Sequence, residues 1–173
     1  DSIAKSILSF SKSNLFEDPY VLAVPKNISL KNIKNLEDLK KSKESKVLNN
    51  IIQFEFGNQH KKRIEEWFTS VLPDSRVFAK TRTYEVALSM VQSGRGVAVV
   101  PALAARLGGK KIDFDVNLYK TNLPQRKIIS LIPSQYVRIE PYKSFIDALV
   151  ETGKNMKLPK TYDVPPILES LSI

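Results

Sequence analysis

The sequence contains no cysteine, and this absence excludes several kinds of chemistry. Disulfides, thiolate metal sites, cysteine nucleophiles and thiol redox switches all need a residue that the chain does not have. With a single histidine, His60, most metal sites and catalytic triads also lack parts. Because disulfides are rare in the cytoplasm, the absence of cysteine also fits a cytoplasmic protein, and we expect that location.

Long apolar runs and catalytic motifs are missing as well. No segment approaches the ~20 apolar residues that a membrane-spanning helix needs, and the first residues lack the basic start and apolar block of a signal peptide. The chain has no G-x-S-x-G motif. Its Gly94-Arg95-Gly96 sequence precedes an apolar run, whereas the dinucleotide-binding fingerprint follows a strand. We therefore expect a protein that binds and does not catalyse, with no cofactor and no metal.

Lysine is abundant, and 27 Lys and Arg against 18 Asp and Glu give a formal net charge of +9. One interpretation is a nucleic-acid-binding surface. The other is a lysine-rich composition spread over solvated faces. The lysines are scattered along the whole length, without the interleaved aromatic residues that stack on bases. We favour the second interpretation and expect no direct contact between this chain and DNA.

Short apolar runs alternate with amphipathic segments along the chain. The apolar runs predict buried strands at 20–25, 50–56, 76–80, 96–100, 112–120 and 127–133. Apolar residues at helical spacing predict helices at 58–72, 83–94, 101–109 and 140–155, with a short one near 36–39. Strands that alternate with helices predict an α/β fold with a mainly parallel sheet.

Particular residues mark the ends and faces of these elements. We expect Asn58 and Thr83 to be helix N-caps and Gly94 to be a C-cap glycine. Four residues of the last helix are expected to point inward: Tyr142, Phe145, Ile146 and Leu149. The tail from 156 to 173 holds three of the ten prolines, and we expect it to be extended.

The candidate binding site lies where the predicted strands end. In α/β sheets, ligands bind beyond the carboxyl ends of the strands and against helix N-termini, whose free N–H groups favour anions. The residues at these positions are Gly57, Asn58, Gln59, His60, Arg82, Thr83, Tyr84, Val100 and Pro101. The Thr83 hydroxyl offers a directional partner for a carboxylate, and Arg82 offers positive charge. The alternative is that Asn58 and Thr83 only cap helices, that His60 only faces solvent, and that nearby Trp67 is a core residue.

Several segments, taken in order, resemble the effector-binding domain of LysR-type transcriptional regulators. The most specific is RTYEVALSMVQSGRGVAVVPALAARL, a helix followed by a Gly-x-Gly-Val-Ala strand and a proline. DSIA at the start, DPYVLAVPKNISLKNIKNLEDL and RKIISLIPSQYVRIEPYKSFIDALVE resemble further parts of that domain. The resemblance covers residues 1 to 151.

This resemblance implies a periplasmic-binding-protein-like type II fold. It has two Rossmann-like α/β lobes with a small effector between them, and here the first lobe is incomplete. Residues 1–21 would be the remnant of lobe 1, 22–126 would be lobe 2, and 127–155 would return to lobe 1. Residues 156–173 form a C-terminal extension that the resemblance does not assign.

The function implied is effector binding and oligomerisation in a transcriptional regulator. A small, anionic metabolite would control DNA binding, through an N-terminal winged helix-turn-helix domain that this chain lacks. The partners implied are that effector and other copies of the chain, as a dimer or tetramer. We expect self-association through sheet edges left open in the incomplete lobe. The alternative function is a stand-alone, exported periplasmic-type solute-binding protein of the same architecture.

Overall fold

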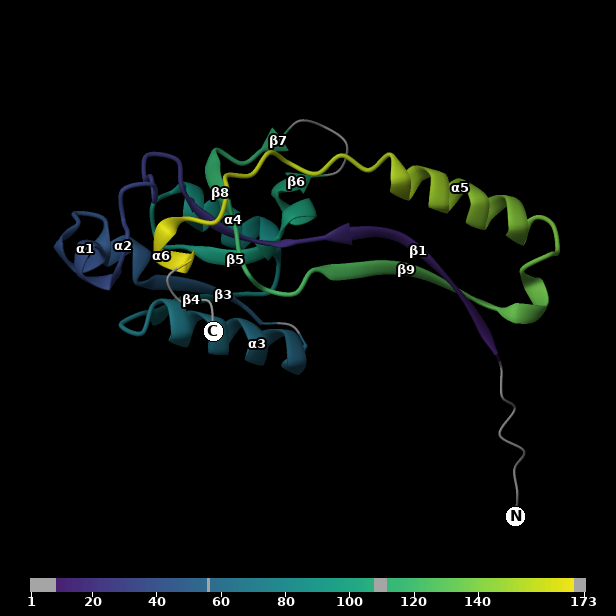
Figure 1. The fold of residues 1–173 in the computed structure, drawn as a ribbon, viewed down its shortest axis with the longest axis horizontal. Helices are drawn as coiled ribbons and strands as arrows, with labels where there is room; N and C mark the ends of the chain where they lie inside the picture. The colour runs from purple at the N-terminus through teal and green to yellow at the C-terminus, as the bar shows by residue number, and fades with distance from the viewer. Residues whose placement is uncertain (1–8, 56, 108–111, 170–173) are drawn as a thin grey trace, which may run out of the picture. The chain divides into compact units, whose positions relative to one another are not determined.

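The computed structural model describes residues 9–55, 57–107 and 112–169, and the chain forms two compact units. Unit 1 consists of Asp1–Asp18 and Arg126–Lys157. Unit 2 consists of Pro19–Gln125 and Leu158–Ile173. Each unit has its own strands and its own helices (Figure 1).

The central strand of unit 2 is β2 (Tyr20–Pro25), and all six of its residues are buried. This confirms the prediction that the apolar run YVLAVP is covered on both faces. Strand β2 pairs antiparallel with β5 (Ala98–Pro101) on one side and with β8 (Val116–Lys120) on the other. It is therefore the strand around which the unit is organised.

The strands β3 (Asn50–Phe54) and β4 (Arg76–Thr81) pair in parallel, and an isolated parallel bridge joins Ile51 to Val97 beside β5. Strands β3, β4 and β5 thus run in one direction, while β2 runs in the other. The prediction of a mainly parallel sheet is wrong at the centre of the unit. A continuous apolar run indicates burial on both faces, and it carries no information on strand direction.

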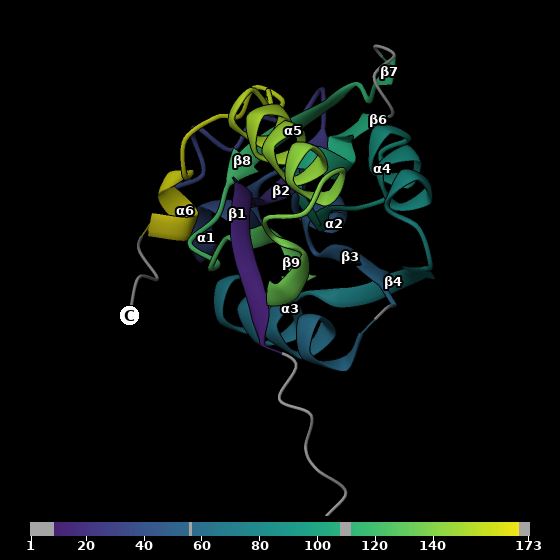
Figure 2. The same ribbon diagram turned by 90° about the vertical axis from the view of Figure 1, so that its right-hand side faces the viewer.

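Helices α3 (Asn58–Val71) and α4 (Tyr84–Gln92) cover opposite faces of these strands. Leu22 and Val24 share a core cluster with the apolar side of α3, whereas Val21 and Ala23 share the second cluster with α4. Alternate residues of a strand point to opposite faces, so the two clusters lie on the two sides of the sheet. Figure 2 shows β3 and β4 between the two helices.

Shorter elements complete unit 2. These are α1 (Leu36–Lys41), α2 (Ser45–Leu48), the 3₁₀ helix η1 (Ala102–Ala105), β6 (Arg106–Leu107), β7 (Ile112–Asp113) and α6 (Pro166–Glu169). Helix α1 confirms the short helix predicted near 36–39. The helix predicted from residue 101 is only η1, after which the chain turns into β6. The strand predicted over 112–120 is split into β7 and β8.

Unit 1 is built on two antiparallel strands, β1 (Phe10–Asp18) and β9 (Arg126–Pro133), with η2 (Ser134–Tyr136) and helix α5 (Tyr142–Lys154). Strand β1 was not predicted, because its polar sequence FSKSNLFED hides the pattern. Helix α5 packs on β1 at Gly153, where a Cβ atom would lie 2.6 Å from the carbonyl oxygen of Leu15. The segment 1–4 that contributed to the resemblance lies outside the described residues.

The apolar face of α5 is not buried as the sequence predicted. Tyr142 and Phe145 are 45% and 63% exposed, and Ile146 and Leu149 are only half-buried. The expectation that all four point into a core is wrong, because a sheet of two strands is too narrow to cover the helix. Unit 1 therefore presents apolar side chains at its surface.

The C-terminal segment is partly extended, as predicted, but it ends in a short helix that the sequence analysis did not expect. Tyr162 forms a parallel bridge with Tyr119 of β8, and Ile167 and Leu168 of α6 join the core on the α3 side. The segment therefore belongs to unit 2 by its contacts. Among the helices of the described residues, none has the length and apolar character that a membrane crossing requires.

Candidate functional site

The carboxyl ends of β3, β4 and β5 lie at the same edge of the unit 2 sheet, because these strands run in the same direction. We call this the carboxyl edge and define it as residues 53–55, 57–61, 80–84 and 100–102. It brings all three predicted segments to one side of the sheet. In α/β sheets this is the side on which ligands bind.

Helix α4 begins at this edge with a side-chain cap. The Thr83 hydroxyl accepts a hydrogen bond of 3.3 Å from the backbone N–H of Val86, which confirms Thr83 as the N-cap. The ring of Tyr84 stacks on that of Phe54, with centroids 4.0 Å apart and planes 23° apart. Arg82 and Thr83 are exposed, whereas Tyr84 is half-buried. This part of the edge combines an aromatic surface, a hydroxyl and a positive charge.

Thr81 directly follows the predicted strand 76–80, but it was not among the nine residues predicted for the site. It is the last residue of β4, lies opposite Phe54 in the register and is only 6% exposed. Its Oγ1 atom is buried and has no hydrogen-bond partner among the described residues. A buried hydroxyl without a partner costs about 1–3 kcal/mol. The available sequence signal was a hydroxyl residue directly after the end of the predicted strand 76–80.

Helix α3 begins at the same edge without a side-chain cap. Its N-cap is Gly57, with φ of 75° and no capping side chain, so the predicted N-cap Asn58 is wrong by one residue. The positive φ of the glycine turns the chain into the helix one residue earlier than expected. The side chains of Asn58, Gln59 and His60 lie outside what the structure describes. The first-turn N–H groups of α3 therefore receive no side-chain acceptor from the capping residue.

A cluster of charges lies beside the start of α3. Glu55 lies 2.9 Å from Lys80 Nζ and 3.7 Å from Lys61 Nζ. The hydrogen bond from Lys80, followed by the positive charges of Lys80 and Lys61, holds the pKa of Glu55 below its ordinary value. Two residues before Glu55, Gln53 Nε2 donates a 2.6 Å hydrogen bond to Glu65 Oε1 of helix α3. Two lysines of the edge are thus already engaged with carboxylates of the chain.

The two remaining predicted residues contribute to this edge mainly through their backbone. Val100 is fully buried in the core cluster on the α4 side, and the neighbouring Pro101 is buried as well. Pro101 pairs with Tyr20 in the sheet, and the next residue donates its N–H to the carbonyl of Pro19 at 2.8 Å. The backbone of Val100 and Pro101 is therefore held in place at this end of the carboxyl edge. No group of three or more His, Asp or Glu side chains that could hold a metal occurs in the described part of the chain.

The family model of the LysR substrate binding domain matches residues 8–154. Among solved structures, the regulatory domain of CcmR from Synechocystis PCC6803, in complex with 2-PG, is similar with a TM-score of 0.57 and 16% identity, over 90% of this chain and 73% of that chain. The effector-binding domain of QuiR in complex with shikimate has a TM-score of 0.51 and 18% identity, over 91% and 71% of the two chains.

A third similar structure is CbnR, a LysR family transcriptional regulator, with a TM-score of 0.50 and 17% identity. Here the match covers 83% of this chain and 47% of that chain, so this chain spans about half the length of that regulator. At these identities the similarity shows the fold. No curated protein matches the chain by sequence.

Proposed function

The chain belongs to the LysR substrate-binding domain family, and from this premise we propose that unit 2 binds a small organic anion at its carboxyl edge. Binding would control transcription through a DNA-binding domain that lies outside this chain. Unit 2 corresponds, in this proposal, to lobe 2 of the two-lobed fold, and unit 1 to part of lobe 1.

The observation that carries the proposal is the buried, unpartnered hydroxyl of Thr81 at the carboxyl edge. A native protein tolerates such a group when water or a ligand completes its hydrogen bonds. A carboxylate or phosphate oxygen accepts from a hydroxyl and from the free N–H groups of a helix start. Both kinds of donor occur at this edge, at Thr81 and at the first turn of α3.

The charges at the edge support an anion over a cation or a neutral ligand. Lys80 and Lys61 are compensated by Glu55, whereas Arg82 is exposed and makes no ion pair with a described residue. The two complexes among the similar structures, with 2-PG and with shikimate, support a small molecule as the ligand of this chain too.

The edge strand β4 supports the proposal that the chain forms a dimer or tetramer. Among the described strands, β4 pairs only with β3, so its other edge has unpaired backbone groups. Phe78 on this strand is 48% exposed, and Val77 and Val86 are exposed nearby on β4 and α4. An open edge with apolar side chains is a surface that another copy of the chain can cover.

A thermal-shift panel of succinate, benzoate, shikimate and inorganic phosphate tests the ligand class. A ligand present at about 100 times its Kd raises the free energy of unfolding by about 2.7 kcal/mol. In a chain of this size, that corresponds to a rise in Tm of roughly 5 °C or more. We expect at least one of the four anions to produce such a shift. If none does, and the protein is folded, the proposed ligand class is wrong.

The variant Thr81→Val separates the two roles of that residue. Removing a buried hydroxyl without a partner is expected to raise the free energy of unfolding of the unliganded protein by about 1 kcal/mol. The same variant is expected to lose most of the Tm shift caused by the anion. Arg82→Gln should also reduce that shift, whereas Arg95→Gln, a second exposed arginine of unit 2, should leave it unchanged. Equal shifts in all four proteins would contradict the proposed site.

A further inference from the structure

The described C-terminal segment, residues 158–169, follows the last helix of unit 1 but docks on unit 2, and we call it the strap. It extends the sheet beyond β8 at one residue, Tyr162. The N–H of Lys120 donates to the carbonyl of Tyr162 at 3.0 Å, and the N–H of Tyr162 donates to the carbonyl of Leu118 at 2.7 Å. These two hydrogen bonds are the backbone attachment of the strap to β8.

The Tyr162 side chain is 43% exposed and lies against the buried ring of Tyr119. Its ring is tilted against that of Tyr119, with centroids 5.1 Å apart, and Lys31 Nζ lies 5.5 Å from the centroid of the Tyr162 ring. The next residue, Asp163, accepts a 2.9 Å hydrogen bond from Lys120 Nζ, and both side chains are mostly exposed. Exposed pairs of this kind are screened by water and hold a segment only weakly.

The second attachment is made by two aliphatic side chains. Ile167 and Leu168 are 3% and 2% exposed, and both belong to the core cluster on the α3 side of the sheet. They are carried by α6, a single turn that begins with Pro166 and follows Pro165. Val164 also packs against this cluster, and Pro165 is buried, so the end of the strap is tied to the core mainly by the two anchors and by these two neighbours.

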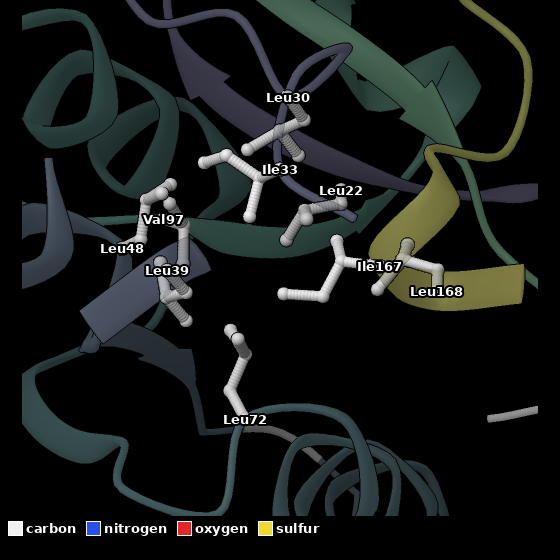
Figure 3. Close-up of a pocket in the computed structure, with 9 residues that line it drawn as sticks. All are labelled: Leu22, Leu30, Ile33, Leu39, Leu48, Leu72, Val97, Ile167 and Leu168. Carbon is white, nitrogen blue, oxygen red and sulfur yellow. The ribbon is translucent and has the colours of Figure 1, made fainter. Parts of the chain in front are cut away.

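The anchors form part of the wall of a small apolar cavity. The cavity volume is about 10 Å³, which is room for about one water molecule. Figure 3 shows its nine lining residues: Leu22, Leu30, Ile33, Leu39, Leu48, Leu72, Val97, Ile167 and Leu168. Such a small void removes few dispersion contacts. The residues of β2 differ from the anchors in another way, because ladder hydrogen bonds on both sides hold them in addition to their packing.

The other walls of the cavity do not depend on the strap. Leu22 and Val97 are held by the central strands β2 and β5, and Leu39 and Leu48 come from α1 and α2. The ladder hydrogen bonds of β2 with β5 and β8 remain when residues 158–169 leave. The strap is attached to unit 2 mainly by a bridge at one residue and by the side chains of one helical turn. The strands of the sheet are attached to one another by continuous ladders of hydrogen bonds.

We propose that the strap opens and closes on unit 2 as one piece, without unfolding of the sheet. Opening uncovers the apolar cavity and frees the outer edge of β8. The chain passes between the units three times, after Asp18, Gln125 and Lys157, and the third connection is anchored at both ends only while the strap is closed. When the strap is closed, the segment after Lys157 is held to unit 2 as well as to unit 1. When the strap is open, only the connections after Asp18 and Gln125 are held at both ends. This inference does not depend on the identity of any effector.

Thiol labelling of the otherwise cysteine-free chain tests the proposal. Ile167→Cys places a thiol on the strap, and Val97→Cys places one on β5 in the same cavity. With a maleimide followed by intact mass, we expect the thiol at position 167 to react at least 100-fold faster than that at position 97. The fluorescence of Trp67, buried in the same core cluster, should stay native throughout. Equal rates at the two positions would mean that the strap opens only when unit 2 unfolds, and would overturn the proposal.

Hydrogen exchange of the unsubstituted chain removes any effect of the cysteines. We expect the Tyr162 amide and the peptide covering 158–169 to exchange at least 100-fold faster than the peptide covering 20–25. Exchange of the two peptides at one common rate would overturn the proposal, because it would place the strap in the same cooperative unit as β2.

Discussion

At the scale of single residues, Gly96 is where the backbone packing of unit 2 leaves no room for a side chain. A Cβ atom at this position would clash with the backbone carbonyl of Asn50, the first residue of β3. Because that backbone is fixed in the sheet, we expect Gly96→Ala to lower the free energy of unfolding by about 3 kcal/mol, at the upper end for overpacking. Urea unfolding measures this loss.

Gly94 provides the matched control two residues earlier. It has φ of 71°, but a Cβ there would meet open space. Gly94→Ala should cost only the strain of a left-handed backbone, about 1 kcal/mol. Equal stabilities of the two alanine variants would contradict the claim that the close approach of Gly96 to the Asn50 backbone excludes a side chain.

The charge pair of Glu55 and Lys80 makes a prediction about pH. The hydrogen bond from Lys80 lowers the pKa of Glu55 in the folded protein below 4.5. A lowered folded-state pKa stabilises the protein above the unfolded-state pKa, and this contribution is lost as the pH falls through the folded value. Glu55→Gln should therefore lower the urea midpoint of unfolding at pH 7. The difference in midpoint between the variant and the parent chain should shrink to zero as the pH falls below 4.5.

The control for this prediction is Glu66→Gln, which removes an exposed pair with Lys62 at 3.8 Å. We expect a smaller effect on the midpoint at pH 7 from this variant. A Glu55→Gln deficit that stayed constant from pH 7 to pH 3 would show that the shape of the side chain, and not its charge, is what stabilises the edge.

Sequence reasoning worked at this scale where a residue type has one dominant local use. Thr83 was predicted as an N-cap and is found as such, and the predicted C-cap glycine Gly94 directly follows the C-cap residue Ser93 with a positive φ. Asn58 was misplaced by one position, because a glycine with positive φ can start a helix without a side-chain cap. Thr81 was left out of the predicted site, because the burial of its hydroxyl follows from the pairing of β4 with β3, which the sequence does not show.

At the scale of elements, strand β4 carries the prediction on self-association. Replacing exposed Phe78 by a charged residue places a charge on the open edge without touching the core. We expect Phe78→Lys to shift the mass measured by light scattering towards the monomer, with an unchanged circular dichroism spectrum. A parent chain that is already monomeric at high concentration would contradict the proposed association.

Phe145→Lys on helix α5 is the matched control for that surface. It replaces a phenylalanine that is also exposed, at 63% against 48% for Phe78, but in unit 1. We expect this variant to associate like the parent chain. If Phe145→Lys dissociates the oligomer and Phe78→Lys does not, the contact lies in unit 1, at the incomplete lobe, as the sequence alone suggested.

The elements were predicted best where periodicity is strong. Helices α3 and α4 and strand β2 were found within a few residues of the expected positions. Strand β1 was missed, because its polar residues show no apolar run, and its place is set by pairing with β9 more than a hundred residues later. Strand direction was also misjudged, since direction depends on how the chain crosses the sheet and not on composition.

At the scale of the whole molecule, the order of several segments identified the family, although no single motif did. The order also led to the right fold class. It did not reveal that residues 158–169 return to unit 2, because two aliphatic anchors after two prolines are not a recognisable pattern. The docking of the strap depends on the cavity that the rest of unit 2 forms, which only the folded structure contains.

The central claim is that a small anion binds at the carboxyl edge of unit 2. The most direct test is an NMR titration of the ¹⁵N-labelled protein with whichever of the four panel anions raises Tm most. We predict saturable shifts of the backbone amides of residues 57–60 and 81–84, with the Thr81→Val variant losing them. Shifts confined to other parts of the molecule, or no saturable shift at millimolar anion, would contradict the claim.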